Sequence, residues 1–164
     1  MKSILLFVTP FVFLAALAQS LKLSEPFSRS AVQALRAINA TGWSLPASVR
    51  ELELRQAEAQ SRMDEAKQAA QSQDDADAFV YLQRYQLKHS QNFADFTGAI
   101  TRTANRMTPR SRTASMDTLQ RAAAQVAKDP QFVARKKKEL ACAAALEKSL
   151  QSRSFTQPGA CELY

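Results

Sequence analysis

Apolar residues recur at alternating spacings of three and four between Asp74 and Met107, and this is the longest helical pattern in the chain. Positions with this spacing lie on one side of an α-helix, within an arc of about 120°. The face consists of Phe79, Leu82, Gln86, His89, Phe93, Phe96, Ile100, Thr103 and Met107. The pattern predicts one long central helix. Most of the other elements are expected to pack over its apolar stripe.

Two helices are expected before the central one. The first runs from Ser28 to about Ala40 with Ser28 as its N-cap, and the second opens at Ser44-Leu45-Pro46. Serine caps helix N-termini, and proline fits the first turn because its missing N–H costs nothing there. The seam of the second helix is thin and consists of Val49, Leu52, Gln56, Ala59, Met63, Ala66 and Ala70. Its partner must therefore approach closely.

The chain is expected to reverse on both sides of the central helix. The seams of the second and central helices differ in phase by two residues, which is about 200° on a helix. A turn is therefore predicted at 71–75, with Ser72 or Asp74 as the cap of the central helix, which ends before Pro109. The next segment, 109–113, reads as an exposed basic loop.

Two further helical patterns follow that loop. Thr113 or Ser115 can cap a fourth helix, and Asp129-Pro130 marks either the start of a last helix or a kink in a continuing one. The apolar residues expected to be buried in the last segment are Phe132, Val133, Leu140, Ala143, Ala144 and Leu150. Together the patterns predict an all-α protein, an up-and-down bundle of about four helices with a short N-terminal helix laid across one end or side.

Residues 1–18 have the pattern of a signal peptide. Met1-Lys2 is a short positive start, 4–14 is an apolar run too short to span a bilayer, and Ala16-Leu17-Ala18 supplies small residues for cleavage before Gln19. A retained signal anchor is the alternative. We expect a secreted protein, periplasmic if bacterial, with 19–164 as a single helical domain.

The only two cysteines, Cys142 and Cys161, are expected to form a disulfide, because export places them in an oxidising compartment. The tail after the last helix is long enough to fold back to Cys142. A loop of this size stabilises by about 3 kcal/mol. Two free thiols, or pairing between chains, are the alternatives.

Two residues near the end of the first helix are also informative. Asn39-Ala40-Thr41 is a glycosylation sequon, so in a eukaryote Asn39 can carry a glycan, whereas in a bacterium the tripeptide has no meaning. Trp43 is the only tryptophan and follows the first helix in the sequence, and we interpret it as a packing anchor rather than a ligand contact.

Basic character is concentrated in residues 101–164. This part holds twelve Lys and Arg against five Asp and Glu, whereas 20–100 holds nine against ten. The candidate residues for binding an anion or a partner are Arg110, Arg112, Arg135, Lys136, Lys137 and Lys138. Four consecutive basic residues point in all directions on a helix, so this turn either overhangs the bundle or lets Lys136 extend its stem to solvent. A solvated surface is the alternative to a binding patch.

Catalytic signatures are absent from the sequence. His89, the only histidine, lies on the apolar seam of the central helix and is interpreted as a packing residue rather than a general base. Asp74, Asp75 and Asp77 look like an acidic metal cluster, but three carboxylates in a first turn are what the helix dipole favours. There is no phosphate loop, zinc-ligand spacing or nucleophile elbow. We expect no catalytic residues, no metal site and no cofactor.

Three function classes remain. The first is a secreted, non-enzymatic interaction protein, an effector-like helical module whose partner is an anionic surface or a protein outside the cell. Peripheral contact with a membrane fits this class, and nucleic acid is not favoured. The second is a carrier of an apolar ligand. The third is a helical enzyme of the exported chorismate mutase type, by analogy alone, with Gln56 and Gln86 as polar seam residues. The sequence leaves the oligomeric state open.

Overall fold

The computed structural model describes residues 22–109 and 112–161, and this part of the chain is an all-α bundle, as predicted. It contains no strand. Its five helices are α2 (Glu25–Ala40), α3 (Val49–Ala69), α4 (Gln73–Met107), α5 (Met116–Val126) and α6 (Pro130–Leu150). The predicted signal peptide, 1–18, lies outside the described residues. Within those residues, no helix carries an apolar stretch long enough to cross a membrane.

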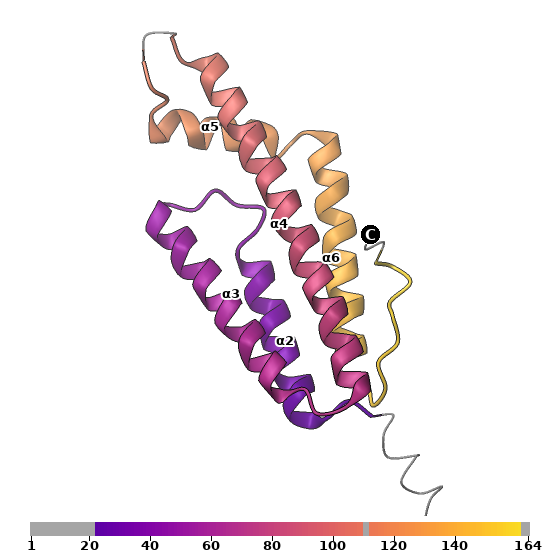
Figure 1. Ribbon diagram of the computed structural model, residues 1–164. Coiled ribbons are helices and arrows are strands. Elements are labelled where there is room, and N and C mark those ends of the chain that lie inside the picture. The colour runs from indigo at the N-terminus through magenta and orange to yellow at the C-terminus, as the bar shows by residue number, and fades with distance from the viewer. Residues whose placement is uncertain (1–21, 110–111, 162–164) are drawn as a thin grey trace, which may run out of the picture.

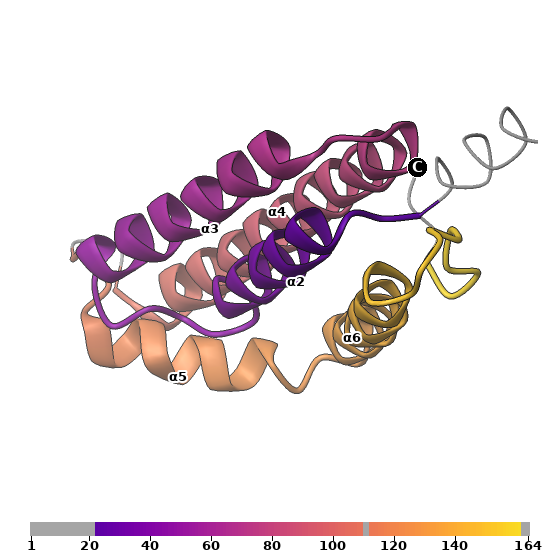
Figure 2. The same cartoon turned by 90° about the horizontal axis from the view of Figure 1, so that it is seen from below.

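Four of the helices, α2, α3, α4 and α6, run alternately up and down, and α5 lies across the far end of α4 (Figure 1). The first helix was expected across one end or side, but α2 lies between α3, α4 and α6 and packs on all three (Figure 2). The reason is the width of its apolar face, since Phe27, Ala34 and Leu35 all have no exposed surface. The shorter α5 packs mainly on α4 and takes the crossing position instead.

Helix starts follow the capping residues, with two corrections. α2 begins one turn before Ser28, because Ser24 is held by the Asp75 carboxylate and serves as the N-cap. α3 begins at Val49 with Ser48 as its cap, so Ser44-Leu45-Pro46 belongs to the preceding loop.

The other caps are as predicted. Ser72 and Asp75 form a capping box at the start of α4, Ser115 caps α5, and Asp129 caps α6 as a separate helix rather than a kinked extension of α5. These short polar side chains bind backbone N–H groups that have no partner within the helix.

The predicted disulfide joins Cys142 in α6 to Cys161, with the two Cα atoms 4.7 Å apart. It folds the tail back along the bundle, where the Tyr81 hydroxyl donates to the Cys161 carbonyl at 3.3 Å. The rings of Tyr81 and Phe155 also pack together. The tail is thereby fixed beside the groove between α4 and α6.

The buried residues form two apolar clusters separated along α4. The lower core joins α2, α3, α4 and α6 and includes Phe27, Leu35, Met63, Leu82, Tyr85 and Leu146. The upper core joins α4 to α5 and consists of Phe96, Ile100, Ala104, Ala122 and Val126. Between the two clusters lie four buried polar residues, Thr41, His89, Asn92 and Glu139. We refer to these four as the polar layer.

The buried face of α6 is only partly as predicted, since Ala143 and Leu150 are buried and Phe132 is half-buried. Val133 and Leu140 are about half exposed and Ala144 is exposed, whereas Glu139, Cys142 and Leu146 point inward. The centre of the buried face is shifted by less than one residue step, which is 100°, and the shift directs a carboxylate rather than a leucine toward α4. As expected for an overhanging turn, residues 133–138 are all exposed.

The apolar seams predicted for α4 and α3 also need correction, because some of their residues are exposed to solvent. Met107 is 48% exposed and Val49 is 73% exposed, so the apolar stripes of α4 and α3 stop short of these ends. Gln56, a seam residue in the prediction, is exposed as well.

Candidate functional site

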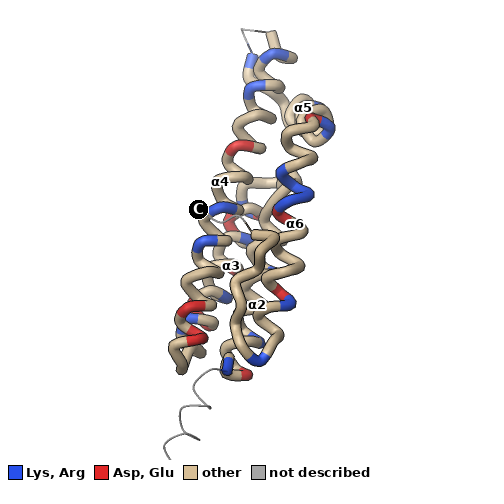
Figure 3. Tube along the Cα trace, turned by 90° about the vertical axis from the view of Figure 1, so that its right-hand side faces the viewer, with Lys and Arg blue, Asp and Glu red and all other residues tan. Residues whose placement is uncertain are grey.

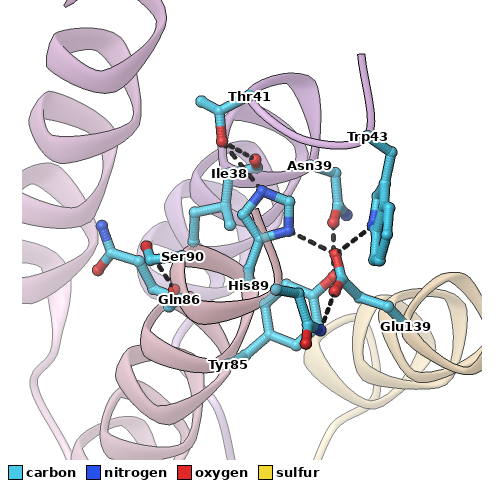
Figure 4. A network of polar contacts seen from close by, with 10 residues as sticks. Ile38, Asn39, Thr41, Trp43, Tyr85, Gln86, His89, Ser90 and Glu139 are labelled. Atoms are coloured by element: carbon cyan, nitrogen blue, oxygen red, sulfur yellow. Dashed lines mark hydrogen bonds and ion pairs between the residues drawn. The ribbon is translucent and has the colours of Figure 1, made fainter. Parts of the chain in front are cut away.

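The polar layer is assembled from three separate parts of the chain. Thr41 comes from the loop after α2, His89 from α4 and Glu139 from α6, and the Trp43 indole lies beside them (Figure 4). Asn92, the fourth member, also belongs to α4. The α4 residues are three apart, so they lie on the same side of the helix. All of these side chains converge on the Glu139 carboxylate or on the His89 ring.

The Glu139 carboxylate accepts hydrogen bonds at both oxygens. Oε1 accepts from Trp43 Nε1 at 2.9 Å and lies 2.5 Å from His89 Nδ1, while Oε2 accepts from Asn92 Nδ2 at 2.5 Å. Burial by itself raises the pKa of this carboxyl, but the bonds from His89, Asn92 and Trp43 outweigh burial and hold the pKa below its usual value. Glu139 is therefore an anion inside the protein.

Both nitrogens of the His89 ring are engaged. The Thr41 hydroxyl donates to the Ile38 carbonyl at 2.7 Å, so the hydroxyl oxygen must accept from His89 Nε2, 3.0 Å away. Nδ1 faces the ionised Glu139 carboxylate and donates to it. We assign a proton to each nitrogen on this basis, which makes His89 and Glu139 a buried ion pair. His89 is 3% exposed, in agreement with the packing role expected from the sequence.

The loop after α2 lies directly on the His89 ring. A Cβ atom at Gly42 would come within 2.2 Å of His89 Cε1, so only glycine allows this approach. The next residue, Trp43, has a φ of 61°, which is rare for residues other than glycine. Its indole packs on Phe96 and Phe132 and donates to Glu139. The packing role predicted for Trp43 is confirmed, and its contacts hold the loop in place.

A cleft of about 520 Å³ opens between α4 and α6 above the ion pair, within the volume range of small-molecule sites. Tyr85, His89, Asn92 and Glu139 form its floor, and Lys88, Gln91, Asp95, Arg135, Lys138, Cys142, Gly159 and Ala160 complete its lining. Among the described residues, no buried side-chain nitrogen or oxygen lacks a hydrogen-bond partner. The buried polar atoms beneath the cleft are therefore all paired within the protein, and the cations nearest to a ligand are those of the rim.

Three cations and one carboxylate lie on that rim. Lys88 comes from α4, and Arg135 and Lys138 come from α6. Arg135 donates to the Asp95 carboxylate across the groove at 2.8 Å. Of the charged side chains that line the cleft, three are cations, Lys88, Arg135 and Lys138, and two are carboxylates, Asp95 and Glu139.

The structure brings together only part of the predicted basic patch. Arg135 and Lys138 line the cleft, whereas Lys136 and Lys137 are exposed on other sides of α6 and do not. Figure 3 shows the run of basic residues in the first half of this helix. Arg112 is exposed on the connection between α4 and α5 and does not line this cleft, and Arg110 lies outside the described residues.

The remaining candidate residues have local partners. Asn39 is half-buried and accepts a hydrogen bond from the Tyr85 hydroxyl at 2.5 Å, and its glycosylation stays a prediction. Asp75 is buried and bonds to Ser24, Gln71 and Ser72, which fits the capping role. Across 22–109 and 112–161, no group of side chains is arranged to hold a metal ion.

Sequence reasoning missed Lys88, Asn92 and Glu139. Asn92 could have been identified from the sequence, because it lies three residues after His89 and four before Phe96, on the same helical face. Glu139 is the one carboxylate beside a basic run and lies three residues before Cys142, a spacing that indicates a shared face. Nothing in the sequence distinguishes Lys88 from other lysines on helix surfaces.

The buried carboxylates predict a loss of stability in acid. Glu139 and Asp75 both have a pKa below the usual value, in each case because hydrogen bonds to the anion outweigh burial. Their contribution should be complete above about pH 5 and lost progressively below about pH 4. Urea unfolding at pH 7, 5, 4 and 3 measures this. Glu139→Gln should flatten part of the decline, and equal stability at pH 7 and pH 3 would contradict the assignment.

Comparison with known proteins gives no further information about the site. No protein-family model matches the chain, and neither a curated protein nor a solved structure is significantly similar to it. The functional argument therefore rests on the geometry of the cleft.

Proposed function

We propose that the protein is an exported, non-enzymatic binding protein and that the cleft between α4 and α6 holds an anionic group of its partner. The observation that carries this proposal is the arrangement of Lys88, Arg135 and Lys138 around one concave surface. Cations held at the rim of a cleft attract anions more strongly than the same charges on a flat surface, because the walls exclude water.

The state of His89 favours binding over proton-transfer catalysis. A general base needs an unprotonated nitrogen directed at the substrate. In His89, Nδ1 is bonded to Glu139 and Nε2 to Thr41, so no lone pair points into the cleft. Gln56 and Gln86, the glutamines considered for an enzyme, do not line the cleft either.

The lining of the cleft also disfavours the apolar carrier. Most of the residues around it have charged or amide side chains, so an apolar ligand would lie against many polar groups. A site for an apolar ligand would instead be lined predominantly by aliphatic and aromatic groups.

The overhanging turn of α6 supports an extended contact with a partner. Lys136 and Lys137 are exposed beside the cleft, next to Val133 and Leu140, which are about half exposed. These lysines add long-range attraction to an anionic surface or an acidic protein outside the cell, and the two apolar side chains add contact area.

Charge reversal at the rim tests the proposal. The protein should bind a fluorescent sulfated polymer and anionic lipid vesicles at low salt and release them near about 0.5 M salt, because exposed charges are screened. Lys138→Glu should weaken binding of the polymer by about tenfold. Fluorescence anisotropy with the folded variants measures this.

Lys137→Glu is the matched control, since it makes the same change of charge on the same turn but outside the cleft. It should weaken binding by no more than about threefold. Equal losses for the two variants would mean that total charge matters and the cleft does not. If the unaltered protein binds neither probe at low salt, the proposed function is wrong.

A further inference from the structure

A second hollow adjoins the cleft further along α4. Its volume is about 430 Å³, and it is lined by Asp95, Ala99, Arg102, Thr103, Arg106, Val126, Asp129, Gln131, Phe132 and Arg135. It shares Asp95 and Arg135 with the cleft. The Arg135–Asp95 ion pair therefore lies where the two hollows meet, and together they form one trough between α4 and the start of α6.

Two arginines in this hollow lack an anionic partner. Arg102 and Arg106 make no hydrogen bond or ion pair with the described residues, whereas Arg29, Arg55 and Arg121 each pair with an acid four residues away. Like charges four residues apart on a helix repel each other. The helix dipole compensates for this near the last turn, at Arg106, but not one turn earlier. The pair is thus suited to an anion from outside the chain.

The cations extend along the whole trough. Lys88 and Arg106 are eighteen residues apart on α4, which is about 27 Å at the helical rise. Lys88 and Lys138 lie at one end, Arg135 in the middle, and Arg102 and Arg106 at the other. One small anion cannot reach both ends, but a linear polyanion can.

We propose that the trough binds a linear acidic polysaccharide, with one charged group in the cleft and another at Arg102 and Arg106. This inference rests on the proposed function and names its partner class. Guanidinium groups bind sulfate and carboxylate through paired hydrogen bonds. Between the cations lie Gln91, Thr103 and Gln131, which can bond to sugar hydroxyls. These neutral polar groups suit the hydroxyl-rich backbone of a polysaccharide better than the backbone of an acidic peptide, which is the competitor in the test.

Oligosaccharides of two lengths test the trough in the full chain. The probes are a sulfated disaccharide and a sulfated decasaccharide prepared from heparin, measured by titration calorimetry. Replacing both Arg102 and Arg106 with Gln should weaken decasaccharide binding by about tenfold or more and leave disaccharide binding unchanged. Lys138→Glu should weaken both, because the disaccharide occupies the cleft alone. Thermal melting should show that each variant is folded.

A gain of affinity provides a second readout. Asp95→Asn removes the carboxylate at the junction and releases Arg135, so the decasaccharide should bind several-fold more tightly. The matched control for the double replacement of Arg102 and Arg106 is a second double variant, in which Arg84 and Arg121 are replaced with Gln. These exposed arginines lie on α4 and α5 and line neither hollow, so their loss should change affinity by less than about threefold.

The possible contrary results distinguish failure of the trough proposal from failure of the cleft proposal. If the Arg102 and Arg106 variant binds the decasaccharide as tightly as the unaltered protein, the trough is wrong, although the cleft proposal stands. If neither saccharide nor the sulfated polymer binds, both proposals fail. If a polyglutamate peptide of equal charge binds as tightly as the decasaccharide, the polysaccharide assignment is overturned in favour of an acidic protein.

Discussion

Replacing Glu139 with methionine should lower the free energy of unfolding by about 3–5 kcal/mol, because it breaks a buried ion pair from one side. The substitution leaves three buried donors, Trp43 Nε1, His89 Nδ1 and Asn92 Nδ2, without their acceptor. Methionine is similar in volume to glutamate, so the loss should come from polar groups rather than from a cavity. Urea unfolding at pH 7 measures it.

Glu147→Met is the matched control for this substitution. Glu147 lies on the same helix and pairs with Arg36 at 2.6 Å, but that pair is at the surface and its loss should cost at most about 1 kcal/mol. Adding His89→Leu to Glu139→Met should cost less than the sum of the two single losses, because both charges are then removed together. Strict additivity of the two losses would show that the residues are not energetically coupled.

Substituting Gly42 with alanine is the second change with a large expected effect, a loss of about 2–3 kcal/mol. The added methyl group would lie 2.2 Å from His89 Cε1 and 2.7 Å from Nε2, far inside normal contact. Neither side can yield easily, because the ring is bonded at both nitrogens and the adjacent Trp43 is packed against Phe96. Thermal and urea unfolding measure the loss, and the histidine NMR signals should shift.

The other two glycines supply controls for the same substitution. At Gly159 a Cβ atom has nothing within 4 Å, so alanine should change stability by less than about 0.5 kcal/mol. At Gly98, inside α4, the nearest atom is the mobile end of Arg102 at 3.3 Å. Alanine there should be neutral or stabilising by up to about 1 kcal/mol, because helix propensity improves. If Gly42→Ala behaves like these two, the close approach to His89 is not real.

The polar layer also links stability to the cleft. Glu139 is part of the cleft floor, and its bonds to Trp43 and His89 tie α6 to α4 and to the loop after α2. The ion pair between Arg135 and Asp95 makes a similar connection one turn away on α6. Together these bonds fix the distance between the two helices, and therefore the positions of the cations at the rim.

Local features of the fold were determined by the sequence. Ser72, Ser115 and Asp129 identify the starts of α4, α5 and α6, because a cap acts only on backbone within a few residues. The disulfide followed from having two cysteines within reach of each other. The long central helix, with His89 on its buried face, followed from spacing.

Only the tertiary structure decided which faces of the helices pack against each other. Leu140 has an apolar side chain and was expected inside, but α6 turns Glu139 inward because His89, Asn92 and Trp43 together satisfy its charge. These partners are 47 to 96 residues away from Glu139 in the sequence, so no local sequence pattern could reveal them. Helical spacing fixes a face only to about one residue, or 100°, and the last rotation depends on partners that the chain brings together only when it is folded. The trough follows from that same rotation, since it sets which cations of α6 face α4.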